Sequence, residues 1–259
     1  MAEPMSPQAQ EWLKALNEGI DGDEHEKLHA EAQRHRAETS SAPKQNVQSF
    51  ERVLLCCFLF GPWLGGISSP FCLVLLWNWD WLNCFTYYLA LMIFFYFGPP
   101  MSEESRQKLI DWINRVGPQA FEEVSYHMEE KVDVAKLERG EDPVMFAYHP
   151  HGMFCWGFFL HGGLHPFYGG GRVVLQGLVA DMLIKSPPFY WIWSVVLRVV
   201  GSASKHNLTA KMMKNESFGL LPGGFEEATI SAAGHDRVYL KKRQGFVKYA
   251  LQYGYRLVP

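Results

Sequence analysis

The distribution of charged and apolar residues divides the chain into three regions. Residues 1–47 are polar, residues 53–102 carry a single charge at Asp80, and the remainder alternates short apolar runs with polar segments. This pattern predicts a polar, partly disordered tail over residues 1–47 and an apolar helical hairpin over residues 48–100. Residues 101–259 are then expected to form a folded domain.

Two apolar runs, Val53–Trp77 and Trp81–Phe97, make up the expected hairpin. A membrane-spanning helix needs about 20 apolar residues, so the first run is long enough and the second is slightly short. Residues 77–81, which join the runs, are rich in tryptophan, and tryptophan favours the membrane–water interface. The pattern predicts a transmembrane or re-entrant hairpin, and the alternative is a buried hairpin in a soluble core.

Basic residues flank the hairpin on both sides and are absent from its turn. Because positive charge accumulates on the cytosolic side of membranes, both ends of the hairpin and the domain after it are expected in the cytosol. The polar N-terminal region lacks the apolar core of a signal peptide, so insertion is expected to use the hairpin itself. The flanking basic residues are Lys44, Arg52, Arg106 and Lys108.

Strand and helix patterns alternate in residues 101–259. Ser102 has the character of a helix N-cap, and Phe246–Tyr253 has a helical pattern. Alternating strands and helices predict an α/β fold with a mixed sheet and flanking helices. The expected strands cover residues 144–148, 173–175 and 218–221, with a further strand beginning at Leu257.

Two parts of this domain leave questions open. The aromatic segment Pro187–Leu197 is too apolar for a surface helix, so it is either core or a second membrane-contacting element. The last residues, Tyr255–Pro259, fall within an expected strand, which suggests that the domain is incomplete at its C-terminus.

Charge and cysteine content narrow the classes of protein. The formal net charge is −3, and nucleic-acid binding requires a basic face, so no nucleic-acid partner is expected. The five cysteines show no zinc-type spacing and no even-numbered framework, which favours a reducing compartment.

The strongest chemical signal is Tyr148-His-Pro-His-Gly152, which directly follows an expected strand. Strand-to-loop junctions are where α/β domains hold reactive groups. Pro150 restricts the backbone of His149, and Gly152 allows close approach of a ligand. An imidazole titrates near neutral pH, so His149 or His151 can act as a general base. A lone histidine is more often structural, but two histidines in this setting favour catalysis.

A second signal, Pro222-Gly-Gly-Phe-Glu-Glu227, follows another apolar run. Paired glycines favour a tight turn whose backbone N–H groups bind an anion or oxyanion, and the carboxylates after them can orient a histidine. The alternative is a turn followed by the acidic first turn of a helix. A third signal, Lys241–Lys248, places cations and a glycine at the start of an expected helix, which suits phosphate groups. A solvated basic surface is its alternative.

Metal binding and a covalent acyl-cysteine have weaker support in the sequence. His161 and His165, together with the two histidines of the first signal, give a His-x-His ligand spacing, but acidic partners are distant in sequence. Cys155 lies close to the histidines and could carry a covalent acyl group, but it has no obvious activating partner.

These three segments, in this order and behind an apolar hairpin, resemble the type-2 diacylglycerol acyltransferase family, which also includes monoacylglycerol and wax-alcohol acyltransferases. The family motif Tyr-His-Pro-His-Gly matches residues 148–152, and Pro-Gly-Gly-x-x-Glu matches residues 222–227. Arg-x-Gly-Phe-Val-(Lys/Arg)-x-Ala matches residues 243–250. The resemblance covers about residues 50–259, and family members continue past this point with a Phe-Gly-Glu motif.

The resemblance implies transfer of a fatty acyl group from coenzyme A to diacylglycerol, with acyl-CoA as co-substrate and with no cofactor or metal. It also implies the endoplasmic reticulum membrane and lipid droplets as the location, and it is compatible with a homo-oligomer. Monoacylglycerol and long-chain alcohols stay open as acceptors. A non-catalytic hairpin protein of lipid droplets is a further alternative, because the C-terminal portion of the family is missing here.

Residue chemistry and resemblance together assign catalytic roles to His149, His151 and Glu227, with His151 as the preferred base. Many glycerolipid acyltransferases have Asp five positions after the base, but Phe154 and Trp156 stand there, so Glu227 is the expected orienting carboxylate. Substrate or acyl-CoA binding is expected at Pro150, Gly152, Pro222, Gly223, Gly224, Arg243, Gly245, Phe246 and Lys248.

Overall fold

A computed structural model describes residues 39–41, 47–121, 125–127, 133–152, 155–162, 164–165, 175–232, 235 and 237–259. Most of the predicted N-terminal tail therefore lies outside the described residues. Within that tail, β1 (Thr39–Ser41) pairs antiparallel with β2 (Ser125–His127), which belongs to the folded domain.

The centre of the domain is a five-stranded sheet with the order β5-β4-β6-β3-β7. All neighbouring strands run parallel, so the prediction of a mixed sheet is wrong. The physical reason is that every connection between these strands contains at least one helix, which carries the chain back to the same edge of the sheet. The strands are β3 (Val144–Ala147), β4 (Gln176–Val179), β5 (Val200–Ser202), β6 (Phe218–Leu220) and β7 (Arg256–Val258).

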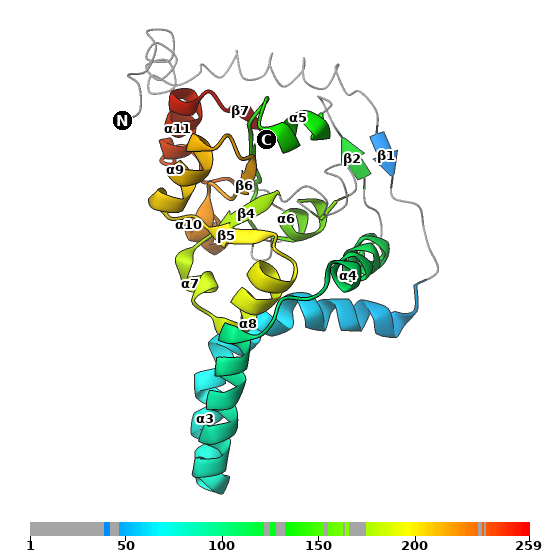
Figure 1. Ribbon diagram of the computed structural model, residues 1–259, viewed down its shortest axis with the longest axis vertical. Coiled ribbons are helices and arrows are strands. Elements are labelled where there is room, and N and C mark those ends of the chain that lie inside the picture. The colour runs from blue at the N-terminus through cyan, green and yellow to red at the C-terminus, as the bar shows by residue number, and fades with distance from the viewer. Residues whose placement is uncertain are drawn as a thin grey trace.

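Helices cover both faces of the sheet, which confirms the α/β class (Figure 1). On one face, α9 (Lys205–Met213) and α11 (Gly245–Tyr253) pack on alternate strand residues. The predicted helix over Phe246–Tyr253 is thereby confirmed. The core on this face contains Met145, Leu178, Leu208, Met212, Phe218 and Ala250.

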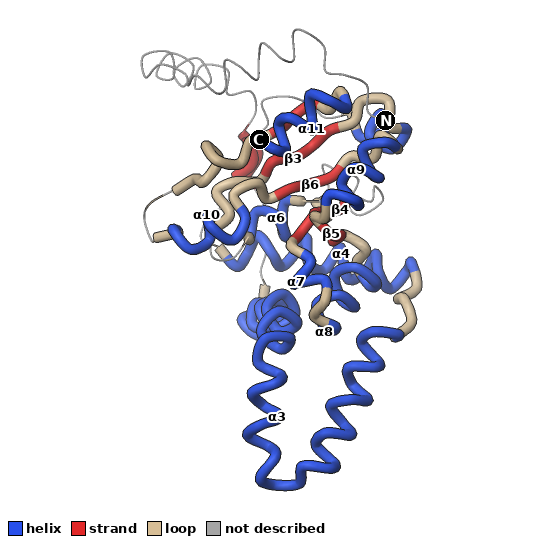
Figure 2. Tube along the Cα trace, turned by 90° about the vertical axis from the view of Figure 1, so that its left-hand side faces the viewer, coloured by secondary structure: helices blue, strands red, loops and turns tan. Residues whose placement is uncertain are grey.

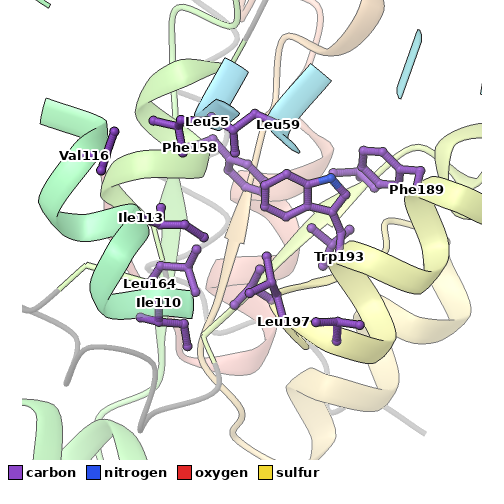
Figure 3. Packing of buried hydrophobic residues seen from close by; sticks show 14 of the residues in the cluster. Leu55, Leu59, Ile110, Ile113, Val116, Phe158, Leu164, Phe189, Trp193 and Leu197 are labelled. Atoms are coloured by element: carbon purple, nitrogen blue, oxygen red, sulfur yellow. The ribbon is translucent and has the colours of Figure 1, made fainter. Parts of the chain in front are cut away.

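The larger core lies on the opposite face (Figure 3). It is formed by α4 (Glu103–Val116), α6 (Trp156–His161), α8 (Pro187–Phe189) and the π-helix η3 (Tyr190–Val196). Ser102 accepts a hydrogen bond from the backbone N–H of Ser105, so the predicted N-cap of α4 is confirmed. Phe189 and Trp193 are buried at the centre, which places the aromatic segment 187–197 in the core.

The predicted helical hairpin is the element α3 (Ser49–Phe97), whose backbone leaves the domain, turns and returns to it (Figure 2). Its first turns pack into the larger core through Leu55 and Leu59. Its end packs on η3, where the rings of Phe94 and Trp191 lie 5.4 Å apart. Across the described residues, no helix is both long enough and apolar enough to cross a membrane.

Arg106, one of the basic residues used to orient the hairpin, has a structural role. It is buried on α4 and forms an ion pair with Glu103 at 2.8 Å, and Arg198 contacts the same carboxylate. The ion pair between Glu103 and Arg198 links α4 to the end of η3, and Arg106 is buried beside this carboxylate on α4 rather than solvated.

The remaining short helices connect the strands. They are η1 (Gly117–Ala120), α5 (Val134–Arg139), α7 (Asp181–Ile184) and α10 (Gly224–Ile230).

The order of the strands defines where a site is expected. After β3 the chain passes β6 and continues as β4. After β6 it passes β3 in the opposite direction and continues as β7. The two connections run in opposite directions and on opposite faces of the sheet, through α6 on one face and α11 on the other, so the carboxyl ends of β3 and β6 form a topological switch point. In open parallel sheets this is where ligands bind.

Candidate active site

The two strongest sequence motifs meet at the switch point. Tyr148–Gly152 follows β3, and Pro222–Glu227 follows β6, the neighbouring strand. The backbone N–H of Tyr148 donates to the carbonyl of Leu220 at 2.9 Å, which extends the ladder into the first motif. Parallel pairing thus brings together two segments that are about seventy residues apart in sequence.

A buried carboxylate joins these segments. Glu227 lies in α10 and has 0% exposure. One of its oxygens accepts a hydrogen bond from the backbone N–H of His151, and the other accepts from the backbone N–H of Tyr239 at 2.7 Å. Glu227 therefore reaches the histidine loop as expected, but it holds the backbone of His151 rather than its imidazole. It fixes the position of the loop.

The His151 imidazole has a defined tautomer. Its Nδ1 lies 2.7 Å from the carbonyl oxygen of Gly152. A carbonyl can only accept a hydrogen bond, so Nδ1 carries a proton, and in the neutral ring the lone pair is then on Nε2. In this tautomer Nε2 is the basic nitrogen, the atom that a general base uses. His149 is exposed at the same loop.

Cys155 lies beside the same ring. Its sulfur is 3.4 Å from Nδ1 and 3.5 Å from Nε2 of His151. Burial, together with the negative charge of Glu227, raises the pKa of the Cys155 thiol to about 12. The thiol is therefore protonated near neutral pH and is a weak nucleophile, since thiolates are the reactive form.

Glycines set the backbone of both loops. Gly152 and Gly224 have positive φ angles of 60° and 57°, a region that favours glycine. At Gly223 a side chain would collide with the carboxylate, because a Cβ there would lie 2.2 Å from Oε2 of Glu227. The Gly224 N–H donates to the carbonyl of Leu221 at 3.1 Å, so this amide is engaged within the turn. Pro222 is buried beside them.

The third motif is connected to the same cluster. Arg243 forms an ion pair with Glu226 and lies over the ring of Tyr239, 6.0 Å from its centroid. The N–H of Glu226 itself, and then Arg243, hold the pKa of the Glu226 carboxyl below its usual range. The segment before α11 is thereby tied to α10, next to the residue that holds His151.

The other residues of the third motif differ in their surroundings. Phe246 is half-buried and packs with the core of α9 and α11. Lys248 is exposed, and a Cβ at Gly245 would meet no atom within 4 Å. Packing within the chain therefore does not require glycine at position 245, so this position leaves room for a ligand.

The histidines were also considered as metal ligands. In the described part of the chain, no three potential metal ligands lie close enough together to hold a metal ion. His165 is buried, and the side chain of His161 lies outside the described residues.

Two contacts of this site were not predicted from the sequence. Tyr239 uses only its backbone N–H toward Glu227, and a backbone donor leaves no signature in the side-chain sequence. Cys155 was placed close to the histidines from the sequence, but the contact of its sulfur with the His151 ring was not predicted.

Fold and site together define a class: an α/β domain with a parallel sheet that carries a two-histidine loop, held by a buried glutamate, at its switch point. The chain belongs to the diacylglycerol acyltransferase family, whose model matches residues 74–259. The resemblance stated from the motifs is thereby confirmed.

The relatives that the chain matches are named as diacylglycerol or 2-acylglycerol O-acyltransferases. The chain is 36% identical over 118 residues to mouse diacylglycerol O-acyltransferase 2-like protein 6, covering 43% of this chain and 34% of the relative. It is 31% identical over 134 residues to budding-yeast diacylglycerol O-acyltransferase 1, covering 49% and 31%. It is 30% identical over 141 residues to human 2-acylglycerol O-acyltransferase 3, covering 52% and 40%. The match thus spans about a third of each relative's length. No solved structure matches the chain.

Proposed function

We propose that this protein transfers a fatty acyl group from acyl-CoA to the hydroxyl of diacylglycerol, with His151 as general base. The observation that carries the proposal is the bridge made by Glu227, which holds the His151 loop against the segment before Arg243. The bridge joins a proton acceptor to a cationic segment suited to the phosphates of coenzyme A.

The chemistry follows from the tautomer of His151. Nε2 takes the proton of the acceptor hydroxyl while that oxygen attacks the thioester carbonyl. The tetrahedral intermediate then collapses, the carbon–sulfur bond breaks, and the imidazolium returns its proton to the departing thiolate of coenzyme A. The Gly152 carbonyl stabilises the imidazolium, because it accepts from Nδ1–H in every state.

Backbone N–H groups near the loop are proposed to stabilise the oxyanion. The amides of His151 and Gly224 are engaged with Glu227 and Leu221, which leaves Gly152 or Gly223 for this role. One such donor is worth roughly 3 kcal/mol where it has been measured.

Arg243, Gly245 and Lys248 are proposed to bind acyl-CoA. Arg243 is oriented by Glu226 and Tyr239, whereas Lys248 extends from α11 into solvent. Cationic side chains beside a helix start favour phosphate groups. Acyl-CoA is thus a co-substrate, and the proposed reaction uses no metal.

The α3 hairpin is proposed to contact lipid and to enter and leave it on the same side. Large apolar side chains are exposed along its returning half, with Phe97 reaching 80% exposure and Tyr87 reaching 76%. A helix that is apolar on all sides and uncovered by protein fits an apolar solvent. The proposed location is the cytosolic face of the endoplasmic reticulum, or a lipid droplet, where both substrates are available.

A second acceptor has specific support. One relative is named 2-acylglycerol O-acyltransferase, so monoacylglycerol is an alternative acceptor, and long-chain alcohols complete the set. The test is to incubate membranes containing the full chain with labelled palmitoyl-CoA and each acceptor in turn, with and without chelator. Preferred formation of triacylglycerol that survives chelator supports the proposal. Transfer to no acceptor contradicts it and favours a non-catalytic hairpin protein, and loss with chelator favours metal chemistry.

A further inference from the structure

The orientation of the His151 ring needs more than one contact. The hydrogen bond to the Gly152 carbonyl oxygen holds Nδ1 at 2.7 Å. The last side-chain torsion of a histidine has a broad energy profile, so the ring can tilt about its bond to Cβ while this hydrogen bond bends. A base must meet a substrate hydroxyl within a narrow range of distances and angles. A second contact that blocks the tilt is therefore of direct value to the reaction.

The sulfur of Cys155 makes such a contact on the face of the ring. It lies 3.4 Å from Nδ1 and 3.5 Å from Nε2 of His151, almost the same distance from two atoms on opposite sides of one ring carbon. The bonding directions of the two nitrogens lie in the ring plane and diverge, so one sulfur cannot lie along both. In the ring plane, a sulfur at these distances would overlap a ring carbon. The sulfur therefore lies over the face of the imidazole.

Helix α6 holds Cys155 in this place. Cys155 is the N-cap residue of α6, and its carbonyl accepts a hydrogen bond from the N–H of Phe159 at 3.1 Å. Phe158, in the same helix, is buried in the larger core (Figure 3). A Cβ at Gly177 of β4 would lie 1.7 Å from Cζ of Phe158, so the Phe158 ring rests directly on the sheet. The start of α6, and with it the sulfur, is thereby fixed relative to the strands that carry the site.

The thiol does not compete with the imidazole for a proton. Burial, and then the negative charge of Glu227, raises the pKa of the Cys155 thiol to about 12, so the sulfur keeps its hydrogen near neutral pH. A protonated thiol cannot take the proton of a substrate hydroxyl, and it places no charge beside the ring. What it contributes is the volume of a polarisable atom against an aromatic face.

We propose that Cys155 is a positioning residue for the reaction at His151: its sulfur covers one face of the imidazole and keeps Nε2 directed at the acceptor hydroxyl. The proposal rests on His151 as the general base of the proposed function. It assigns Cys155 neither a nucleophilic role nor a proton-transfer role. An atom of similar size at the γ position can therefore replace the sulfur, whereas removal of that atom lets the ring tilt.

The kinetic test compares variants of Cys155 with a matched cysteine elsewhere. Palmitoyl transfer to diacylglycerol is measured for the full chain in membranes at equal protein levels. Cys155→Ala removes the sulfur and should lower kcat about tenfold, with the KM values of both substrates within about twofold of wild type. Cys155→Val places a methyl group at the γ position and should keep kcat within about threefold. Cys56→Ala makes the same change at another half-buried cysteine, on α3, and should leave kcat and KM unchanged.

A second readout follows the ring itself and needs no turnover. Diethyl pyrocarbonate modifies neutral imidazoles, and fragmentation of the peptide that contains both histidines gives a separate rate for each. Cys155→Ala uncovers the face of His151 and should raise its rate of modification at least threefold. Cys155→Val should restore the wild-type rate. His149, which is exposed at the same loop, should react equally in every variant.

The outcomes separate this proposal from its alternatives. If kcat and the His151 rate in Cys155→Ala stay within twofold of wild type, or if Cys155→Val is as slow as Cys155→Ala, the proposal is overturned. Loss of all transfer in both variants, with a palmitoyl group captured on Cys155 of the wild type, makes the cysteine a nucleophile and also overturns it. Transfer to no acceptor, with the expected pattern of His151 rates, refutes the proposed function alone. Transfer that does not depend on Cys155 refutes this inference alone.

Discussion

Replacing Glu227 by Gln tests whether the buried carboxylate positions the base. In the wild type both carboxylate oxygens accept from backbone N–H groups, one from His151 and one from Tyr239. A glutamine has only one accepting oxygen, so its amide group must face one of these donors. The change removes one charge-assisted hydrogen bond, worth about 1.5–3 kcal/mol, and leaves a buried donor unsatisfied.

The expected kinetic effect follows from that energy. If the free energy that holds the loop in its reactive geometry falls by about 2 kcal/mol, turnover falls roughly 30-fold, because 1.36 kcal/mol corresponds to a factor of ten in rate. We expect Glu227→Gln to lower kcat by about 10- to 100-fold and to change the KM for acyl-CoA little, because the carboxylate contacts no cationic residue of the third motif. The assay is palmitoyl transfer to diacylglycerol in membranes with equal protein levels.

Glu226→Gln is the matched control, since it makes the same substitution one residue earlier. Glu226 is exposed and pairs with Arg243, so this variant should affect the KM for acyl-CoA and keep kcat within about threefold. A Glu227→Gln protein that accumulates normally and keeps kcat within twofold of wild type would refute a positioning role for Glu227.

Three further predictions concern the same cluster. Gly223→Ala should lower kcat as much as Glu227→Gln, because the Cβ that it adds would lie 2.2 Å from the Glu227 carboxylate. Gly245→Ala, whose Cβ would meet no atom within 4 Å, should fold normally in thermal-shift measurements. Burial raises the pKa of the Cys155 thiol to about 12, so its thiolate fraction rises about tenfold with each pH unit between pH 7 and 10. The rate of alkylation of Cys155 by iodoacetamide should rise by the same factor, and a plateau near pH 8 would contradict this. Arg243→Gln should raise the KM for acyl-CoA severalfold with little change in kcat, and an unchanged KM would remove Arg243 from phosphate binding.

Much of the fold was predictable because it depends on local patterns. The strands at Val144–Ala147 and Phe218–Leu220 are short apolar runs, and the helix at Gly245–Tyr253 repeats its apolar residues at helical spacing. Two of the residues in the strand expected at 173–175 lie outside the described residues, and the described strand is Gln176–Val179. The strand β5 was not predicted at all. Val200–Ser202 has only three residues and follows a long aromatic helix, so its strand character comes from pairing with β4.

The direction of pairing is a non-local property, which explains the wrong prediction of a mixed sheet. Similarly, the approach of Glu227 to the histidine loop was predictable from its motif, but its target atom was not. Whether a carboxylate meets a ring nitrogen or a backbone N–H depends on the turn at Gly223, where the close packing of Glu227 leaves no space for a side chain.

The most direct test of the central claim is lipid analysis of a host that lacks neutral-lipid synthesis, expressing the full chain beside its His151→Ala variant. We expect the host with the wild-type chain to accumulate triacylglycerol, and His151→Ala at the same protein level to lower that amount at least a hundredfold, because the general base is gone. Equal triacylglycerol from the two proteins, or none from the wild type, would contradict it.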